Sequence, residues 1–279
     1  MRYVIFALLF ILLQNVHAFG NELWFESARG MNMGARTYAI YFGKFPSHRM
    51  QPGALNGVHV LLKDYTSHIR PLKIKKRRRA YCVRVPAIFN GNYTLIAMKR
   101  EKNKNVSTVY VAKVNFYVRH QRDGKITRPN DDMAVFGPQV PFELIRLRSR
   151  RGEPFFLSRT GHRIRFRVYF HGKPVSGAVV VVTTRSGWSK RMISDKNGEV
   201  EFTAIQDRFP ASKYRWRPEI YLVSAFYTNS GTRYVATYPI YTYISPDAWR
   251  SYAAGIFILL VVMLAVGLWA YFKRRESRF

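Results

Sequence analysis

The sequence predicts an all-β fold made of two β-sandwich domains, followed by one C-terminal transmembrane helix. Helical periodicity is almost absent between residues 20 and 245. Short β-branched and aromatic runs recur there, separated by Gly, Pro, Asn and Asp. Two long apolar segments stand at the chain ends, outside this β-rich body.

The N-terminal segment predicts a secretory signal peptide over residues 1–18. An apolar run from Tyr3 to Leu13 follows Arg2, and the small-residue pattern that ends in Ala18 is typical of a cleavage site. We therefore expect the rest of the body to be exported.

The first sandwich is expected over residues 19–150 and the second over residues 154–245. A stretch with charges, Gly152 and Pro154 divides two apolar patterns and indicates the boundary. The predicted strands of the first domain are Thr37–Phe42, Gly57–Leu62, Ala80–Val85, Gly91–Met98 and Val109–Tyr117. Those of the second are Arg163–Phe170, Ala178–Thr184, Glu199–Thr203, Ile220–Tyr227 and Thr232–Tyr238.

Two motifs of the second domain indicate its kind of sandwich. The segment His171–Ala178 turns on Gly172 and Pro174 and enters a continuous apolar run. The segment Ser194–Phe202 supplies an Asn-Gly turn into an alternating strand. Together they resemble the prealbumin-like or carboxypeptidase-regulatory-like sandwich, with Ser194 where that pattern prefers Thr. This fold hosts many functions, so the resemblance implies an architecture only.

The C-terminal segment predicts a transmembrane helix over residues 250–272. Tyr252–Phe272 carries no charged side chain and would cover roughly 30 Å as a helix. The tail, residues 273–279, is basic, which favours a cytoplasmic C-terminus and a periplasmic or extracellular body. The sequence thus predicts a single-pass protein of the cell (inner) membrane. A buried core helix is the alternative interpretation of this segment.

Two segments of the first domain resemble a bacterial periplasmic family of nickel or cobalt uptake accessory proteins. They are Asn21–Glu26, directly after the predicted cleavage site, and Tyr41–Pro46. The resemblance implies an accessory role in transition-metal uptake, with a membrane transporter or envelope protein as partner. Where the family has a leading His, this chain has Asn21, which is a poorer nickel ligand.

Soft side chains near the start of this domain are the candidate metal ligands. Thioethers and an imidazole occur close together in the sequence and would suit a transition-metal ion such as copper(I). The candidates are Met31, Met33, His48 and Met50. The methionines would equally well fill a patch of core.

The chain is strongly basic, with a formal net charge of +30, and therefore attracts anions. Two stretches concentrate the charge and are the candidate anion-binding residues: Lys73, Lys75, Lys76, Arg77, Arg78 and Arg79, and then Arg148, Arg150 and Arg151. Anionic lipid, glycan or an acidic protein would fit them. Nucleic acid is disfavoured because no nucleic-acid motif occurs and the predicted topology keeps the body out of the cytosol. The alternative is a solvated edge strand, blunted by Pro71, that prevents aggregation.

No motif of an enzyme accompanies these features. The sequence has no G-x-S-x-G elbow, no H-E-x-x-H pair and no Gly-rich phosphate loop. We therefore expect a non-enzymatic, membrane-anchored binding or assembly module. Two roles are favoured: an accessory of metal uptake or of an envelope complex, and a structural or adhesive surface protein that contacts anionic lipid or glycan. An exported hydrolase with an unrecognised site is a third, less favoured class.

Overall fold

A computed structural model confirms the all-β sandwich class. It describes residues 20–27, 37–47, 50, 53–64, 66–77, 80–86, 91–103, 106–118, 135–148, 157–209, 211–214, 217–246 and 252–276. The predicted signal peptide, residues 1–18, lies outside these ranges.

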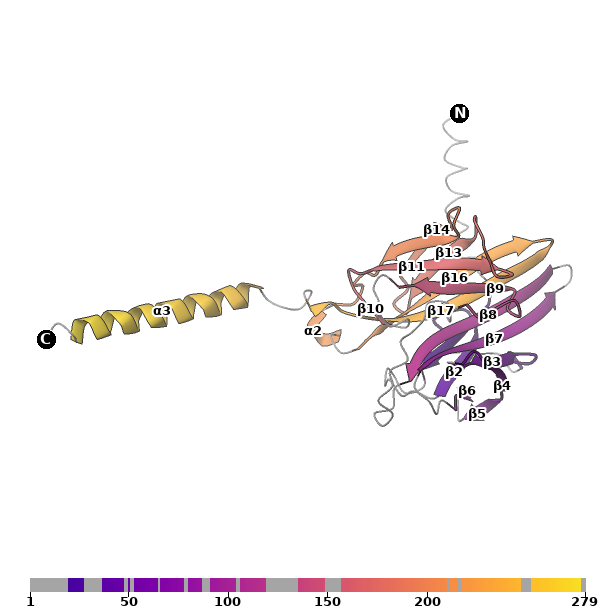
Figure 1. The fold of residues 1–279 in the computed structure, drawn as a ribbon, viewed down its shortest axis with the longest axis horizontal. Coiled ribbons are helices and arrows are strands. Elements are labelled where there is room, and N and C mark those ends of the chain that lie inside the picture. The colour runs from indigo at the N-terminus through magenta and orange to yellow at the C-terminus, as the bar shows by residue number, and fades with distance from the viewer. Residues whose placement is uncertain are drawn as a thin grey trace, which may run out of the picture.

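The described residues form three sheets and two helices, arranged as Figure 1 shows. In the N-terminal half the strands are β1 (Glu22–Ser27), β2 (Thr37–Gly43), β3 (His59–Lys63), β4 (Ile69–Leu72), β5 (Ile74–Arg77), β6 (Ala80–Arg84), β7 (Gly91–Asn103) and β8 (Val106–Val118). The strands that follow are β9 (Phe142–Leu147), β10 (Leu157–Arg159), β11 (Arg163–Phe170), β12 (Lys173–Pro174), β13 (Val179–Thr184), β14 (Ser189–Ile193), β15 (Glu199–Thr203), β16 (Glu219–Asn229) and β17 (Thr232–Tyr243). The helices are α2 (Ala211–Tyr214) and α3 (Tyr252–Glu276).

A nine-stranded sheet runs through both halves of the body. Its strand order is β14-β13-β16-β17-β8-β7-β3-β4, and β10 pairs with β17 beside this path. The two halves join where β17 pairs in parallel with β8, with Ala236 opposite Val111. Backbone hydrogen bonds therefore continue from one half into the other.

The two outer sheets cover opposite faces of this central sheet. Successive residues of a strand point to opposite faces, and β8 shows both environments. Val109 and Val111 lie in one core with β9, β11 and β15, whereas Tyr110 and Ala112 lie in a second core with β1, β2 and β6. The body is thus a three-layer structure in which two sandwiches share their middle sheet.

The predicted strands all appear, and β11 and β15 have the predicted bounds. Strand β9 was not predicted. It precedes residue 150 in the chain, yet it pairs along its whole length with β11. Strand pairing therefore crosses the boundary expected between the two domains.

A third, smaller core lies between β1 and the second half of the central sheet. It contains Trp24 from β1, Phe45 from the turn after β2, Ile220 and Leu222 from β16, and Tyr241 from β17. We call this cluster the seam, because it joins the first outer sheet to strands of the second half.

The C-terminal helix α3 carries exposed apolar side chains. Those of residues 256–264, for example, are all at least 48% exposed. Side chains of α3 are described only for residues 255–269 and 273. Within what is described, no helix has both the length and the apolar character that crossing a bilayer requires. The transmembrane segment at 250–272 stays a prediction.

Candidate functional site

Of the four candidate metal ligands, only Met50 lies within the described residues. Its sulfur accepts a hydrogen bond from the backbone N–H of Phe42 at 3.2 Å. Met31, Met33 and His48 lie outside the described ranges. No cluster of three or more His, Cys, Asp or Glu side chains that could hold a metal occurs among the described residues. The metal site therefore stays a prediction.

The candidate anion-binding residues lie in two separate parts of the fold. Lys73, Lys75, Lys76 and Arg77 belong to the β4–β5 segment, on the first outer sheet and the edge of the central sheet. Arg148 follows β9, which belongs to the opposite outer sheet. Arg78, Arg79, Arg150 and Arg151 lie outside the described residues. Among the described candidates, the structure brings together only the first four.

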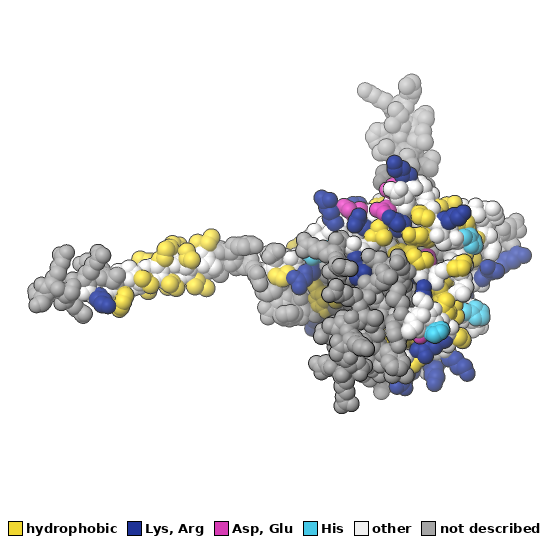
Figure 2. Space-filling model, in the orientation of Figure 1, with side chains coloured by type: hydrophobic (Ala, Val, Ile, Leu, Met, Phe, Trp, Pro, Cys, Tyr) yellow, Lys and Arg dark blue, Asp and Glu magenta, His cyan; other side chains and the backbone are white. Residues whose placement is uncertain are grey.

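These four cations sit where the chain changes sheets. Strand β4 is the edge of the central sheet, and β5, one residue later, is the edge of the first outer sheet. We call Lys73, Lys75, Lys76 and Arg77 the basic corner. Figure 2 shows Lys and Arg side chains gathered over the part of the body where Figure 1 places β4 and β5.

The local sequence explains this corner. Pro71 lacks a backbone donor and lies on the edge strand β4, as the sequence predicts. In β5, Ile74 turns inward against the core, whereas Lys73 and Lys75 on either side of it are exposed. The alternation thus buries the aliphatic side chain and leaves the cations in solvent.

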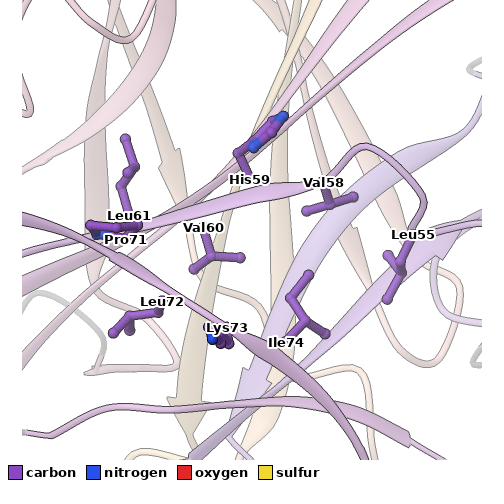
Figure 3. A pocket seen from close by; sticks show the side chains of 9 residues that line it. All are labelled: Leu55, Val58, His59, Val60, Leu61, Pro71, Leu72, Lys73 and Ile74. Atoms are coloured by element: carbon purple, nitrogen blue, oxygen red, sulfur yellow. The ribbon is translucent and has the colours of Figure 1, made fainter.

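A shallow groove of about 470 Å³ lies beside the basic corner, between β3, β4 and the start of β5. Figure 3 shows its lining: Leu55, Val58, His59, Val60, Leu61, Pro71, Leu72, Lys73 and Ile74. Most of these side chains are aliphatic. Lys73 is the point at which the groove meets the cations.

No acidic side chain neutralises the basic corner within the described part of the chain. None of its four cations forms an ion pair there, whereas Lys99, Arg163, Arg167 and Arg208 each pair with a glutamate. Cys82 on β6 lies opposite Lys75 and is buried. Burial raises the pKa of its thiol, although Arg77 acts in the opposite direction. The thiol is thus protonated at neutral pH and adds no negative charge to the corner.

The two N-terminal segments Asn21–Glu26 and Tyr41–Pro46 meet at the seam. In the β1–β2 pair, Trp24 lies opposite Tyr41, and their rings stack at 5.4 Å between centroids. Phe45 packs edge-on against Trp24 at 5.7 Å. The indole N–H of Trp24 donates to Glu26, which also accepts from Arg185 of the second half at 2.7 Å. These motif residues therefore hold the halves together.

Glu22 gives the seam a titratable group close to neutral pH. Burial raises the pKa of its carboxyl to about 7, while a hydrogen bond from Ser224, a backbone hydrogen bond at Phe45 and the charge of Arg233 oppose this rise. Glu22 begins β1, and Ser224 and Arg233 belong to β16 and β17. Its protonation is thus linked to how β1 packs on the central sheet.

Sequence reasoning missed a buried ion pair between the central sheet and the second outer sheet. Lys113 of β8 donates to Glu143 of β9 at 2.6 Å, and each side chain is only 1% exposed. The Glu143 carboxylate also accepts from the backbone N–H of Phe136. A lysine within the mostly apolar run Val109–Val114 was the available signal.

Comparison with known proteins adds no family. No family model matches the chain, and no curated protein sequence matches it.

Solved structures show only distant similarity. A Ca²⁺-stabilised adhesin that helps an Antarctic bacterium bind ice has 9% identity and a TM-score of 0.24, over 80% of this chain and 49% of that one. The BSP domain of a biofilm-associated protein has 9% identity and a TM-score of 0.22, over 77% and 28%. A DUF4785 family protein from Legionella pneumophila has 8% identity and a TM-score of 0.20, over 73% and 50%. This chain spans half or less of each structure, and at such TM-scores the similarity carries no argument about function.

Proposed function

We propose that this protein is a non-enzymatic binding protein, held at the outer face of the cell (inner) membrane by α3, and that its basic corner binds an anionic glycan. The supporting observation is the set of exposed cations on the edge strand β5 and on the single residue that links it to β4, with no described acidic partner. A short row of fixed cations suits the repeated carboxylate or sulfate groups of an acidic glycan.

The basic corner lies several strands away from β17, the strand that leads to α3. The exposed apolar side chains of α3 support attachment to the membrane, because water is a poor solvent for such a helix. The chain reaches α3 from β17, and β4 is four strands away across the central sheet. Strands lie about 4.8 Å apart, so the corner is displaced laterally by about 19 Å from β17.

The test compares two pairs of charge removals in the full-length protein in mild detergent. The variant Lys75→Gln/Lys76→Gln neutralises the basic corner. The control Lys190→Gln/Arg191→Gln removes the same charge from β14, the edge of the central sheet that lies opposite β4, where both side chains are also exposed. Binding to heparin, as a sulfated glycan probe, is measured over a range of salt concentrations.

We expect the corner variant to lose roughly tenfold or more in affinity, since a cation near an anionic surface contributes about 1 kcal/mol. The control should lose much less. Equal losses in the two variants would mean that the net charge alone attracts heparin, and the proposal would be wrong. Corner-dependent binding to phosphatidylglycerol vesicles, without binding to heparin, would instead identify lipid as the ligand.

A further inference from the structure

A second surface lies at the end of the body from which the chain continues to α3. Its described side chains are Arg208, Phe209, Lys213, Tyr214 and Arg217, on and around α2. We call this surface the α2 loop. We propose that the α2 loop binds anionic phospholipid headgroups beside the point where α3 enters the membrane, which rests on the membrane attachment proposed above.

Strand register places the α2 loop next to the exit of the chain towards α3. The loop leads directly into β16, whose first residue, Glu219, lies opposite Thr242 near the end of β17. After β17, the backbone N–H of Ser245 donates to the Thr160 hydroxyl, and the backbone N–H of Thr160 donates to the Tyr243 carbonyl. The segment that follows β17 towards α3 is thus hydrogen-bonded to the body. Figure 1 shows α2 at the end of the body from which α3 extends.

The side chains of the α2 loop combine exposed apolar and cationic groups. Phe209 is 73% exposed, more than any other large apolar side chain described. Lys213 and Arg217 are exposed as well. An aromatic ring beside cations suits the membrane interface, where the ring enters the headgroup region and the cations meet lipid phosphates. In water the exposed ring of Phe209 makes no comparable favourable interaction.

Internal contacts hold the α2 loop in a defined shape. Arg208 forms an ion pair with the buried Glu219 and donates to the backbone carbonyl of Arg217 at 3.0 Å. The Arg208 guanidinium lies 4.9 Å from the centre of the Tyr214 ring, and the Lys213 ammonium lies 5.6 Å from it. Phe209 is therefore presented from a braced segment, so less conformational entropy is lost when it meets a bilayer.

The test reads the depth of a nitroxide label in full-length protein reconstituted into vesicles. One variant carries the label at Phe209→Cys. The matched control carries it at Asn229→Cys, which is exposed and lies at the opposite end of β16. The native Cys82 is buried, so labelling of the unaltered protein should be minimal. The vesicles are phosphatidylcholine alone, or phosphatidylcholine and phosphatidylglycerol in equal parts.

For each label we take the ratio of its accessibility to membrane-dissolved oxygen to its accessibility to a water-soluble relaxing agent. In the anionic vesicles we expect this ratio to be at least about threefold higher at position 209 than at position 229. Adding Lys213→Glu and Arg217→Glu should remove this difference. If the protein floats with the vesicles while both labels stay equally exposed to water, the α2 loop does not bind lipid, but the proposed membrane attachment through α3 is still supported. If the protein floats with neither vesicle type, both the proposed membrane attachment and the proposed lipid binding by the α2 loop are wrong.

Discussion

The buried pair of Lys113 and Glu143 offers the sharpest test of how the layers are held together. Nζ of Lys113 lies 2.6 Å from Oε2 of Glu143, and both side chains are 1% exposed. Burial lowers the pKa of Lys113, while the charge and the hydrogen bond of Glu143 oppose that shift. Lys113→Met therefore leaves a carboxylate buried without its cation, in a place that water cannot reach.

The expected loss in the free energy of unfolding follows from the burial of the unpaired Glu143 carboxylate away from water. Removing one partner of a buried ion pair costs about 3–5 kcal/mol of the free energy of unfolding. Adding Glu143→Gln to Lys113→Met removes the unpaired charge and keeps an oxygen that can accept from the backbone N–H of Phe136. The double variant should therefore regain at least half of the loss.

Urea denaturation of full-length protein in detergent, followed by tryptophan fluorescence, measures both variants. Because the two sandwiches share the central sheet, we expect a single unfolding transition in each case. A Lys113→Met variant as stable as the parent would refute the reasoning, and so would a double variant less stable than the single one. Either result would mean that the pair is not desolvated as the fold indicates.

Three further predictions concern the seam and a turn. The carboxyl pKa of Glu22 rises from 4.5 to about 7 on folding, so the folded state favours the protonated form. The free energy of unfolding should therefore fall by at most about 3 kcal/mol as the pH rises from 4.5 to 7. Denaturant unfolding across this pH range should show a flatter pH profile for Glu22→Gln than for the parent protein. Trp24 is fully buried, so Trp24→Ala should cost about 3–5 kcal/mol in denaturant unfolding, and a cost below that of an average surface change would contradict its role in the seam. Gly198 has φ +75°, and an added Cβ would lie 2.8 Å from the Val168 carbonyl oxygen, so Gly198→Ala should destabilise by about 1–3 kcal/mol, whereas Asn197→Ala in the same turn should cost less in the same assay.

Much of the fold could be predicted because turn residues separate short β-branched and aromatic runs, some of which alternate apolar and polar residues. Arg163–Phe170 shows this pattern, and its odd positions face away from the core as expected. Strand β9 was missed because Glu143 and Arg146 interrupt its apolar pattern, although both are buried in the structure. Strand β14 was missed because most of its side chains are exposed. The parallel pairing of β17 with β8 joins residues far apart in the chain, and no local pattern encodes it.

The candidate site could be predicted only in part. Pro71 and the alternation around Ile74 indicated an exposed basic edge, and the structure places Pro71 on the edge strand β4, with Lys73 and Lys75 exposed. The separation of Arg148 from that edge follows from β9 joining the opposite outer sheet. The α2 loop was missed because Phe209 lies outside every predicted strand, so only its 73% exposure marks it.

The pairing of β17 with β8 also bears on how the molecule would carry mechanical load. Tension applied at the C-terminal end enters β17, an inner strand with hydrogen-bonded neighbours on both sides. Such a pull runs along the strand, so many backbone bonds must shear at once instead of opening one after another. A ligand held at the basic corner would then load the central sheet through its edge strand β4.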